Sequence, residues 1–265
     1  MWFNMTDEKQ QVKSILLTPI ECNYKCAHWK PVNIFRQNGR IYSSQKYRNA
    51  LDPDMSDLAV EFYNIVYEDI LKSKDTIEPK KILKEGFLEN IDFAGDTMNS
   101  FNSIANGVSG AGLSAAKRTE KKEWPEFLQK YYSKYHCLAN FWILPMRIGR
   151  RSGKLNRYDS VDIFLNKLKE GYSDVLKKDT EYLRKLKTYD EFCCKHFIKE
   201  CEQFSTDTVL EMYRNSSDKV KSDKAKEEIV EHAYQFMELR AESISSNDEI
   251  CKKLYKRFKE LEILY

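Results

Sequence analysis

Residues that interrupt helices are scarce in this sequence, above all in its second half. The 265 residues include six prolines and nine glycines, yet no proline follows Pro145 and no glycine follows Gly171. Proline removes a backbone donor, and glycine loses more conformational freedom on folding than any other residue. Apolar residues also recur at helical spacing after residue 159. We therefore predict that residues 159–265 form an overwhelmingly helical C-terminal half.

Long apolar runs are absent as well. No stretch of 18 uncharged apolar residues occurs, so we expect no transmembrane helix and no membrane partner. The first residues, MWFNMTDEKQQVK, contain an acidic pair where a signal peptide has a basic region, which predicts no secretion signal. The sequence contains seven cysteines, an odd number, and they are scattered among stretches rich in lysine and glutamate. That usage is typical of free thiols in a reducing compartment, and we expect a cytoplasmic protein.

Strand signals are confined to the N-terminal region. The stretch 12–20, VKSILLTPI, predicts a short buried strand closed by proline. The stretch VNIFRQNGRIYSS predicts a β-hairpin, because Asn38-Gly39 supplies the two positive-φ positions of a type I′ turn. With 42% hydrophobic and 13% aromatic residues, the chain has enough apolar surface for a core. We expect a mainly α (α+β) fold, in which a β element at 12–48 packs on one helical domain spanning 1–265.

Two further segments are expected to shape the middle of this domain. Asp52-Pro53 predicts the start of a helix over residues 54–73, with aspartate as its N-cap and proline as its first residue. The motif GDTMNSF (Gly95–Phe101) predicts a structured turn, and the glycine- and serine-rich stretch 103–118 predicts a flexible loop. Both GDTMNSF and residues 136–145 mix small polar residues with large aromatic ones, so we expect these two segments to meet.

The net charge of +3 is unevenly distributed. Residues 115–157 contain eleven lysines and arginines and three glutamates, a balance of +8, so the remainder carries 33 basic and 38 acidic residues, or −5. Guanidinium groups suit phosphate oxygens, and a basic patch is typical of nucleic-acid binding. The alternative is a basic loop that pairs with acidic helices of the C-terminal half. The candidate phosphate-binding residues are Arg147, Arg150, Arg151, Lys154 and Arg157.

His136 and Asn140 are the candidate catalytic pair. If the segment Tyr135–Phe141 is helical, the two side chains lie on the same face. In nucleases that use histidine and asparagine, the histidine acts as a general base or metal ligand and the asparagine orients it. The alternative is that both side chains form hydrogen bonds with the backbone at the end of a helix, because buried polar groups need partners in any protein.

Metal binding has two candidate locations. Asp92 and Asp96 lie four residues apart beside hydroxyl and amide side chains, and such oxygen ligands suit Mg²⁺. Asp96 is also a candidate helix N-cap, with Met98 and Phe101 pointing into the core. Zinc ligands could come from Cys22, Cys26 and His28 together with Cys193, Cys194 and His196. For these cysteines we favour a buried structural role, because Cys193 and His196 fall on an apolar helix face.

The central segment resembles part of a known nuclease family. YHCLANFWILP, with the following MRIGRRSGKLN and YDSVDIFLNKL, resembles a segment in the C-terminal nuclease domain of modification-dependent restriction endonucleases, which is of the His-Asn-His type. The family's upstream Glu-His-Ile-x-Pro strand has no counterpart, since no histidine occurs between His28 and His136. The resemblance implies cleavage of nucleic acid. The matched positions are His136, Leu138, Asn140 and Leu144, with Asn156 as a looser match and Ala139 in place of the family's glycine.

A second resemblance is closer but carries no activity. GDTMNSF combined with LANFWILP (Leu138–Pro145) resembles an uncharacterised family of bacterial proteins that carries both motifs, and it covers most of residues 87–200. The expected function is therefore a nucleic-acid-binding, diverged nuclease-like protein, of the kind found in bacterial anti-phage defence. The alternative is a non-enzymatic protein-interaction or structural module, in which the same residues form a buried hydrogen-bonding core.

Overall fold

Helices dominate the part of the chain that the structure describes, which confirms the mainly α (α+β) prediction. The structure is a computed structural model, and it describes residues 3–22, 34–44, 53–71, 93–101, 125–145, 161–178, 186–199 and 223–264. The α-helices within these ranges are α1 (Phe3–Leu17), α2 (Asp57–Val66), α3 (Glu68–Leu71), α6 (Glu126–Tyr132), α7 (Val161–Lys178), α9 (Tyr189–Lys195), α12 (Asp223–Ser246) and α13 (Asp248–Glu260). Two short 3₁₀ helices are η2 (Pro53–Met55) and η5 (Leu138–Asn140).

A three-stranded sheet lies near the N-terminus. The central strand β3 (Arg40–Ser43) pairs in parallel with β1 (Ile20–Cys22) and antiparallel with β2 (Phe35–Gln37). The hairpin between β2 and β3 was predicted and is confirmed. Asn38 has φ of 50° and Gly39 has φ of 73°, the two left-handed residues that a type I′ turn requires.

The predicted strand at 12–20 is wrong over most of its length. Residues up to Leu17 belong to α1, and only Ile20–Cys22 form a strand. Val12, Ile15 and Leu16 are buried, and their spacing of three and four residues matches one face of a helix. A short apolar run fits a buried strand or a buried helix equally well, which explains the error.

A second sheet occupies the middle of the fold. Strand β4 (Phe93–Thr97) pairs antiparallel with β5 (Phe141–Pro145), so that Thr97 lies opposite Phe141. The predicted meeting of the two segments is confirmed. However, the first residues of GDTMNSF form a strand rather than a turn, and no helix begins at Asp96. Gly95 is needed here, because a Cβ atom at this position would lie 2.3 Å from the carbonyl oxygen of Asp54.

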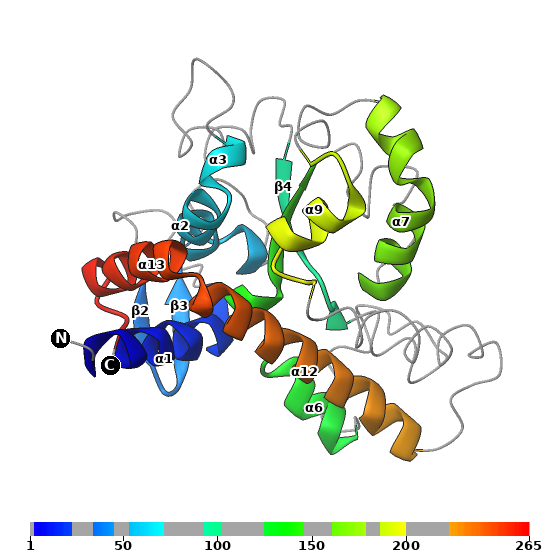
Figure 1. Ribbon diagram of the computed structural model, residues 1–265. Coiled ribbons are helices and arrows are strands. Elements are labelled where there is room, and N and C mark those ends of the chain that lie inside the picture. Colours follow the sequence, from blue (N-terminus) through cyan, green and yellow to red (C-terminus); the bar gives the residue numbers. More distant parts are fainter. Residues whose placement is uncertain are drawn as a thin grey trace.

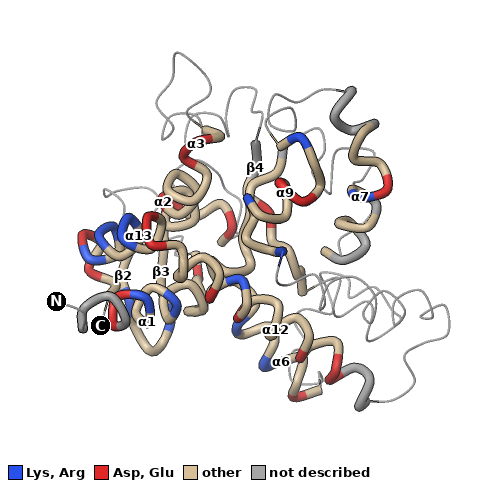
Figure 2. Tube along the Cα trace, in the orientation of Figure 1, with Lys and Arg blue, Asp and Glu red and all other residues tan. Residues whose placement is uncertain are grey.

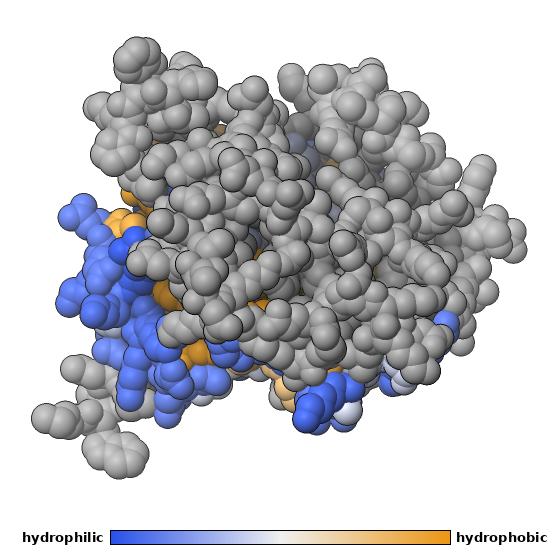
Figure 3. All heavy atoms as spheres, turned by 90° about the horizontal axis from the view of Figure 1, so that it is seen from above, coloured by the Kyte–Doolittle hydropathy of each residue, from blue (hydrophilic) through white to orange (hydrophobic). Residues whose placement is uncertain are grey.

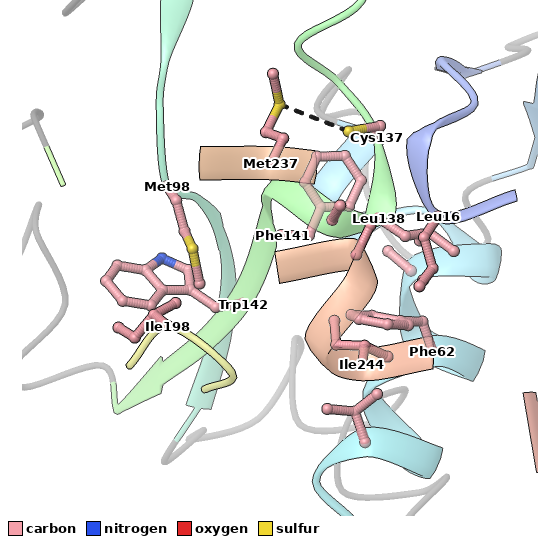
Figure 4. Close-up of a cluster of buried hydrophobic side chains, with 14 of the residues drawn as sticks. Leu16, Phe62, Met98, Cys137, Leu138, Phe141, Trp142, Ile198, Met237 and Ile244 are labelled. Atoms are coloured by element: carbon pink, nitrogen blue, oxygen red, sulfur yellow. Dashed lines mark hydrogen bonds between the residues drawn. The ribbon is translucent and has the colours of Figure 1, made fainter. Parts of the chain in front are cut away.

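Helices pack around these sheets (Figure 1). α1 packs against α12 and α13, α12 crosses α6 and η5, and α2 contacts β5 and α13. The two ends of the chain lie close together beside α1 and α13 (Figure 1). Figure 4 shows how the core is shared among these elements: Phe141 of β5 lies beside Met237 of α12, Trp142 lies beside Met98 and Ile198, and Ile244 of α12 lies beside Phe62 of α2. Figure 3 shows that the described outer surface is largely hydrophilic in that view.

Helix boundaries differ from those predicted around residue 53. Pro53 begins the 3₁₀ helix η2, and α2 starts only at Asp57. Its N-cap is Ser56, whose hydroxyl accepts a hydrogen bond from the Ala59 N–H at 3.3 Å. The predicted helix over 54–73 is also interrupted at Tyr67, which separates α2 from α3.

The C-terminal prediction is confirmed for the described ranges 161–178, 186–199 and 223–264, where every regular element is a helix. Val161, Phe164, Leu165, Leu168 and Tyr172 form the buried face of α7, as their spacing predicts. The predicted loop at 103–118 lies outside the described residues. Within the described ranges, no helix has the length and apolar character needed to cross a membrane.

Candidate functional site

Asn140 lies at the junction between the two central motifs. Its side chain is fully buried. The Oδ1 atom accepts a hydrogen bond from the Asn99 N–H at 3.0 Å, and Nδ2 donates to the Asn99 carbonyl at 3.1 Å and to the Tyr135 carbonyl at 2.7 Å. The Asn140 carbonyl also accepts from the Met98 N–H at 2.8 Å. Asn140 therefore continues the β4–β5 ladder and joins GDTMNSF to LANFWILP.

The hydrogen-bonding capacity of this amide is used by the backbone. An asparagine amide has two N–H donors, and here both reach carbonyl oxygens of the chain. The Asn99 carbonyl receives a further hydrogen bond from the Tyr131 hydroxyl at 2.8 Å. The arrangement corresponds to the structural alternative for Asn140, in which the side chain satisfies backbone groups.

The condition for a His136–Asn140 pair, a helix over Tyr135–Phe141, is not met. Residues 138–140 form η5, and β5 begins at Phe141. Aromatic and β-branched residues favour strands, and the FWI run of β5 finds its partner in β4. His136 precedes η5, so it and Asn140 do not share the face of a regular α-helix. No hydrogen bond between these two side chains occurs among the described residues.

His136 is packed among aromatic rings. Its ring centroid lies 3.8 Å from that of Tyr135 and 6.2 Å from that of Phe141. Burial lowers the pKa of His136 to about 3. The imidazole is therefore neutral at pH 7 and a much weaker base than an ordinary histidine, whereas an efficient general base has a pKa near the working pH. Its carbonyl oxygen accepts a hydrogen bond from the Ile20 N–H at 2.7 Å, which ties the segment to β1.

Asp96 lies on β4 opposite Trp142. Its Oδ1 atom accepts a hydrogen bond from the Thr97 N–H at 2.8 Å. The neighbouring Thr97 hydroxyl donates to Oδ2 of the buried Asp54 at 2.9 Å. Within the described ranges, no group of three histidine, cysteine or acidic side chains is arranged to hold a metal ion.

Several predicted site residues lie outside the described residues. They include the second metal candidate, Asp92, and the zinc candidates Cys26 and His28. All five candidate phosphate ligands also fall there, namely Arg147, Arg150, Arg151, Lys154 and Arg157. The structure therefore brings together His136, Asn140 and Asp96 in one region around β4 and β5, and their predicted partners in phosphate and metal binding are not among the described residues.

A buried arginine on α12 organises the same region. Arg240 has no solvent exposure. Its Nε donates to the His196 carbonyl at 2.8 Å, and Nη1 donates to the carbonyls of Ala139 at 2.7 Å and Leu138 at 3.3 Å. Its Nη2 lies 3.3 Å from the Tyr67 hydroxyl oxygen. Among the described residues, no carboxylate forms an ion pair with it.

Helix ends explain how this charge is accommodated without a carboxylate. His196 is the C-cap of α9, and Tyr67 is the C-cap of α2. Leu138 and Ala139 belong to η5; the Leu138 carbonyl also accepts a hydrogen bond from the N–H of the C-cap Phe141, while the Ala139 carbonyl accepts from Arg240. The C-terminal ends of helices carry partial negative charge, so a guanidinium placed among them is both hydrogen-bonded and electrostatically stabilised.

His196 completes the cluster. Its Nδ1 lies 3.0 Å from the Tyr67 hydroxyl. The Tyr67 oxygen accepts from Arg240 and from the backbone of Ile143, so its own hydrogen points to Nδ1 of His196. Burial, followed by the charges of Arg240 and Lys195, holds the pKa of His196 well below its ordinary value, and burial raises the pKa of Tyr67 to about 12. Both side chains are neutral at pH 7.

The buried position of His196 and Cys193 confirms the apolar helix face predicted for them. Arg240 and Tyr67 were not predicted as members of a cluster. A signal for Arg240 exists in the sequence, because Ala233, Phe236, Arg240 and Ile244 follow one another at spacings of three or four residues, and all four are buried. An arginine inside an apolar helical stripe indicates a buried partner set.

Comparisons with protein-family models, with curated proteins and with solved structures find no match to this chain. The two resemblances noted in the sequence therefore stay predictions.

Proposed function

We propose that the chain is a diverged nuclease-like protein that binds nucleic acid through its basic stretch, 115–157, and uses His136 and Asn140 for structure rather than cleavage. The charge distribution supports the binding part of the proposal. Eleven basic residues against three acidic ones stand in this stretch, while the rest of the chain is net acidic. Phosphate groups are the ligands that such a charge balance favours.

The hydrogen bonds of Asn140 support the second part of the proposal, in which this residue serves structure and not cleavage. A catalytic asparagine would need an amide group free to orient the histidine or the substrate. Both donors of Asn140 are held by the carbonyls of Asn99 and Tyr135. His136, with a pKa of about 3, is a poor proton acceptor at pH 7. Binding without cleavage is the function that best fits these two side chains.

The connections of the basic residues also favour binding. Arg147 stands two residues after Pro145, the last residue of β5, and Arg157 stands four residues before α7, which begins at Val161. The cationic residues are therefore joined at both ends to elements with buried side chains, including Leu144 of β5 and Val161 of α7.

The test is a salt titration of binding to single- and double-stranded oligonucleotides, with Mg²⁺ present. Each neutralised phosphate releases counterions, so five phosphate contacts on duplex DNA give a log–log slope of about −4.5. Replacing Arg150 and Arg151 with alanine is expected to flatten that slope by roughly two units and to weaken binding to all sequences alike. The matched control replaces Lys187 and Lys199, two exposed lysines outside the basic stretch, with alanine and is expected to leave the slope unchanged.

Cleavage is measured in the same samples. We expect wild-type protein to bind and leave the oligonucleotides intact, and His136→Ala to bind like wild type. Cleavage by wild type that disappears in His136→Ala would overturn the structural role of His136. Absence of binding to every oligonucleotide at low salt would overturn the proposal as a whole and leave the protein-interaction module as the function.

A further inference from the structure

The last helix, α13, carries its basic residues in two different states. The helix contains five basic and three acidic residues. Two of the basic residues, Lys253 and Arg257, form ion pairs with acidic residues of α2 and α3. Lys253 lies 2.7 Å from Glu68, and Arg257 lies 3.1 Å from Glu61. These ion pairs hold α13 against α2 and α3, so the charges of Lys253 and Arg257 are already neutralised within the fold.

The acidic residues of α13 are all paired as well. Asp248 pairs with Lys9 of α1 at 2.7 Å, Glu249 with Lys253 at 2.6 Å, and Glu260 with Arg257 at 2.8 Å. Each acidic side chain of α13 therefore has an ion-pair partner outside the group of other lysines, although Asp248 also attracts Lys252 more weakly. Figure 2 shows basic and acidic positions close together along this helix.

The remaining basic residues are Lys252, Lys256 and Lys259. All three are exposed, and none forms an ion pair with a residue that the structure describes. Their spacings of four and three residues place them on one face of the helix. The buried residues Cys251 and Leu254 lie on a different face, which packs into the core. Three exposed lysines therefore stand in a row on the outside of α13; we call them the lysine face.

The dimensions of the lysine face fit a phosphate backbone. Seven residues of α-helix rise about 10.5 Å. Successive phosphates of one DNA strand advance about 3.4 Å each along the duplex axis, so three steps cover about 10 Å. Lysine is a compact point charge on a flexible stem, which suits contact with phosphates whose exact positions vary.

The preceding helix carries the opposite charge. Glu227, Glu228, Glu231 and Glu238 of α12 are exposed, and none of them forms an ion pair with a described residue. These carboxylates disfavour a polyanion on the exposed face of α12 itself, whereas α13 attracts one. The exposed side chains named here thus change from negative charge on α12 to positive charge on the lysine face of α13.

We propose that the lysine face of α13, formed by Lys252, Lys256 and Lys259, is a second phosphate-contacting surface for nucleic acid, separate from the basic stretch at 115–157. The inference rests on the proposed nucleic-acid binding, but it uses only residues that the structure describes. Lysine side chains on this surface would contact backbone phosphates and not the edges of bases. The surface therefore contributes affinity without sequence preference.

The test compares two triple variants of the whole chain in salt titrations on duplex and single-stranded oligonucleotides. Replacing Lys252, Lys256 and Lys259 with glutamine removes the charges and keeps most of each stem, and it is expected to flatten the duplex slope by about 2.7 units. Replacing the same residues with arginine keeps the charges and is expected to preserve both slope and affinity. Replacing Glu227, Glu231 and Glu238 with glutamine is expected to leave binding equal to or tighter than that of wild type.

The outcomes separate this inference from the proposed function. If wild type binds and the Arg150/Arg151 variant flattens the slope, but the triple glutamine variant binds like wild type, the lysine face is not a contact surface. If wild type binds no oligonucleotide, both proposals fail. Anionic phospholipid vesicles serve as a further arm, because loss of vesicle binding in the glutamine variant with no oligonucleotide binding in wild type would assign the lysine face to a lipid surface instead.

Discussion

Arg240 and the lysine face of α13 carry the same sign of charge on consecutive helices, in opposite environments. Arg240 is fully buried, and carbonyl oxygens of three residues accept its hydrogen bonds. Lys252, Lys256 and Lys259 are exposed and have no ion-pair partner among the described residues. The guanidinium is held by the protein backbone, whereas the three ammonium groups face solvent.

The comparison indicates which polar residues of this chain serve structure and which serve binding. A buried polar group must be satisfied by the protein, because water cannot reach it. Asn140 follows the same rule as Arg240, since its amide is held by the backbone. An exposed charge has water and salt as partners and gives them up readily to a phosphate. Substitutions in the first group should change stability, and substitutions in the second should change binding.

Replacing Arg240 with methionine tests the buried side of the comparison and has the largest expected effect. The methionine retains the apolar stem but leaves the carbonyls of Ala139 and His196 without their donor, while the Leu138 carbonyl keeps the Phe141 N–H. Each unsatisfied buried group costs about 1–3 kcal/mol, so we expect the free energy of unfolding to fall by about 2–6 kcal/mol. Urea denaturation followed by circular dichroism measures it.

The control for this variant is Lys13→Met on α1. Lys13 pairs with Glu242 of α12 on the surface, at 2.5 Å. Exposed ion pairs contribute little, and we expect a change within about 1 kcal/mol. Equal decreases in the free energy of unfolding in the Arg240 and Lys13 variants would mean that the buried guanidinium stabilises the fold no more than an exposed ion pair does.

The sequence contains the local features of this region but not its long-range ones. The type I′ turn at Asn38-Gly39 and the helical stripes after Val161 depend on neighbours within a few residues, so they could be predicted. The pairing of β4 with β5 joins segments far apart in the chain, and its register depends on Gly95 passing close to the Asp54 carbonyl. No local pattern specifies that approach.

The role of Asn140 illustrates the same limit. Its proximity to His136 in sequence suggested a catalytic pair, because that interpretation assumed a helix. The partners that Asn140 uses, Asn99 and Tyr135, are set by the β4–β5 junction and by the end of α6. Likewise, the position of Arg240 in an apolar stripe signals burial, but the carbonyls that accept its hydrogen bonds come from separate helices.

Replacing Asn140 with aspartate is the second prediction. The shape is kept, but the two N–H donors are replaced by an oxygen atom that faces the carbonyls of Asn99 and Tyr135. We expect a loss of about 2–3 kcal/mol in the free energy of unfolding, since each of the two carbonyls loses one of its donors and a buried carboxylate is placed against both carbonyl oxygens. Binding to oligonucleotides at a temperature where the variant is folded should be unchanged. Unchanged stability would return Asn140 to the list of functional candidates.

The third prediction concerns pH. The pKa of His196 is held well below the ordinary value of 6.5, and that of His136 is lowered to about 3, in both cases chiefly by burial. The unfolded chain therefore binds more protons, and stability must fall as the pH drops below 6.5. Each histidine contributes a slope approaching about 1.4 kcal/mol per pH unit. We expect the free energy of unfolding to fall by about 2 kcal/mol between pH 6 and pH 5.

The variant His136→Asn isolates one of these two contributions. It should remove roughly half of the pH dependence between pH 6.5 and pH 5, whatever its effect on stability at pH 7. A pH profile identical to that of wild type would show that His136 titrates normally in the folded protein. It would then qualify as a general base, and the cleavage assay would have to be repeated at lower pH.

The smallest expected effect on stability belongs to the lysine face, and it completes the comparison with Arg240. Replacing Lys252, Lys256 and Lys259 with glutamine removes three charges from α13, where they form no ion pair with a described residue. Surface substitutions away from packed or paired features change stability by no more than about 0.5 kcal/mol each. Relief of repulsion among the three lysines favours the variant slightly, because like charges four residues apart oppose helix formation. We therefore expect urea midpoints that match wild type or exceed it, together with the loss of salt-dependent binding. A clear drop in stability would mean that these lysines stabilise the fold as Arg240 does, and that their exposure does not indicate a binding surface.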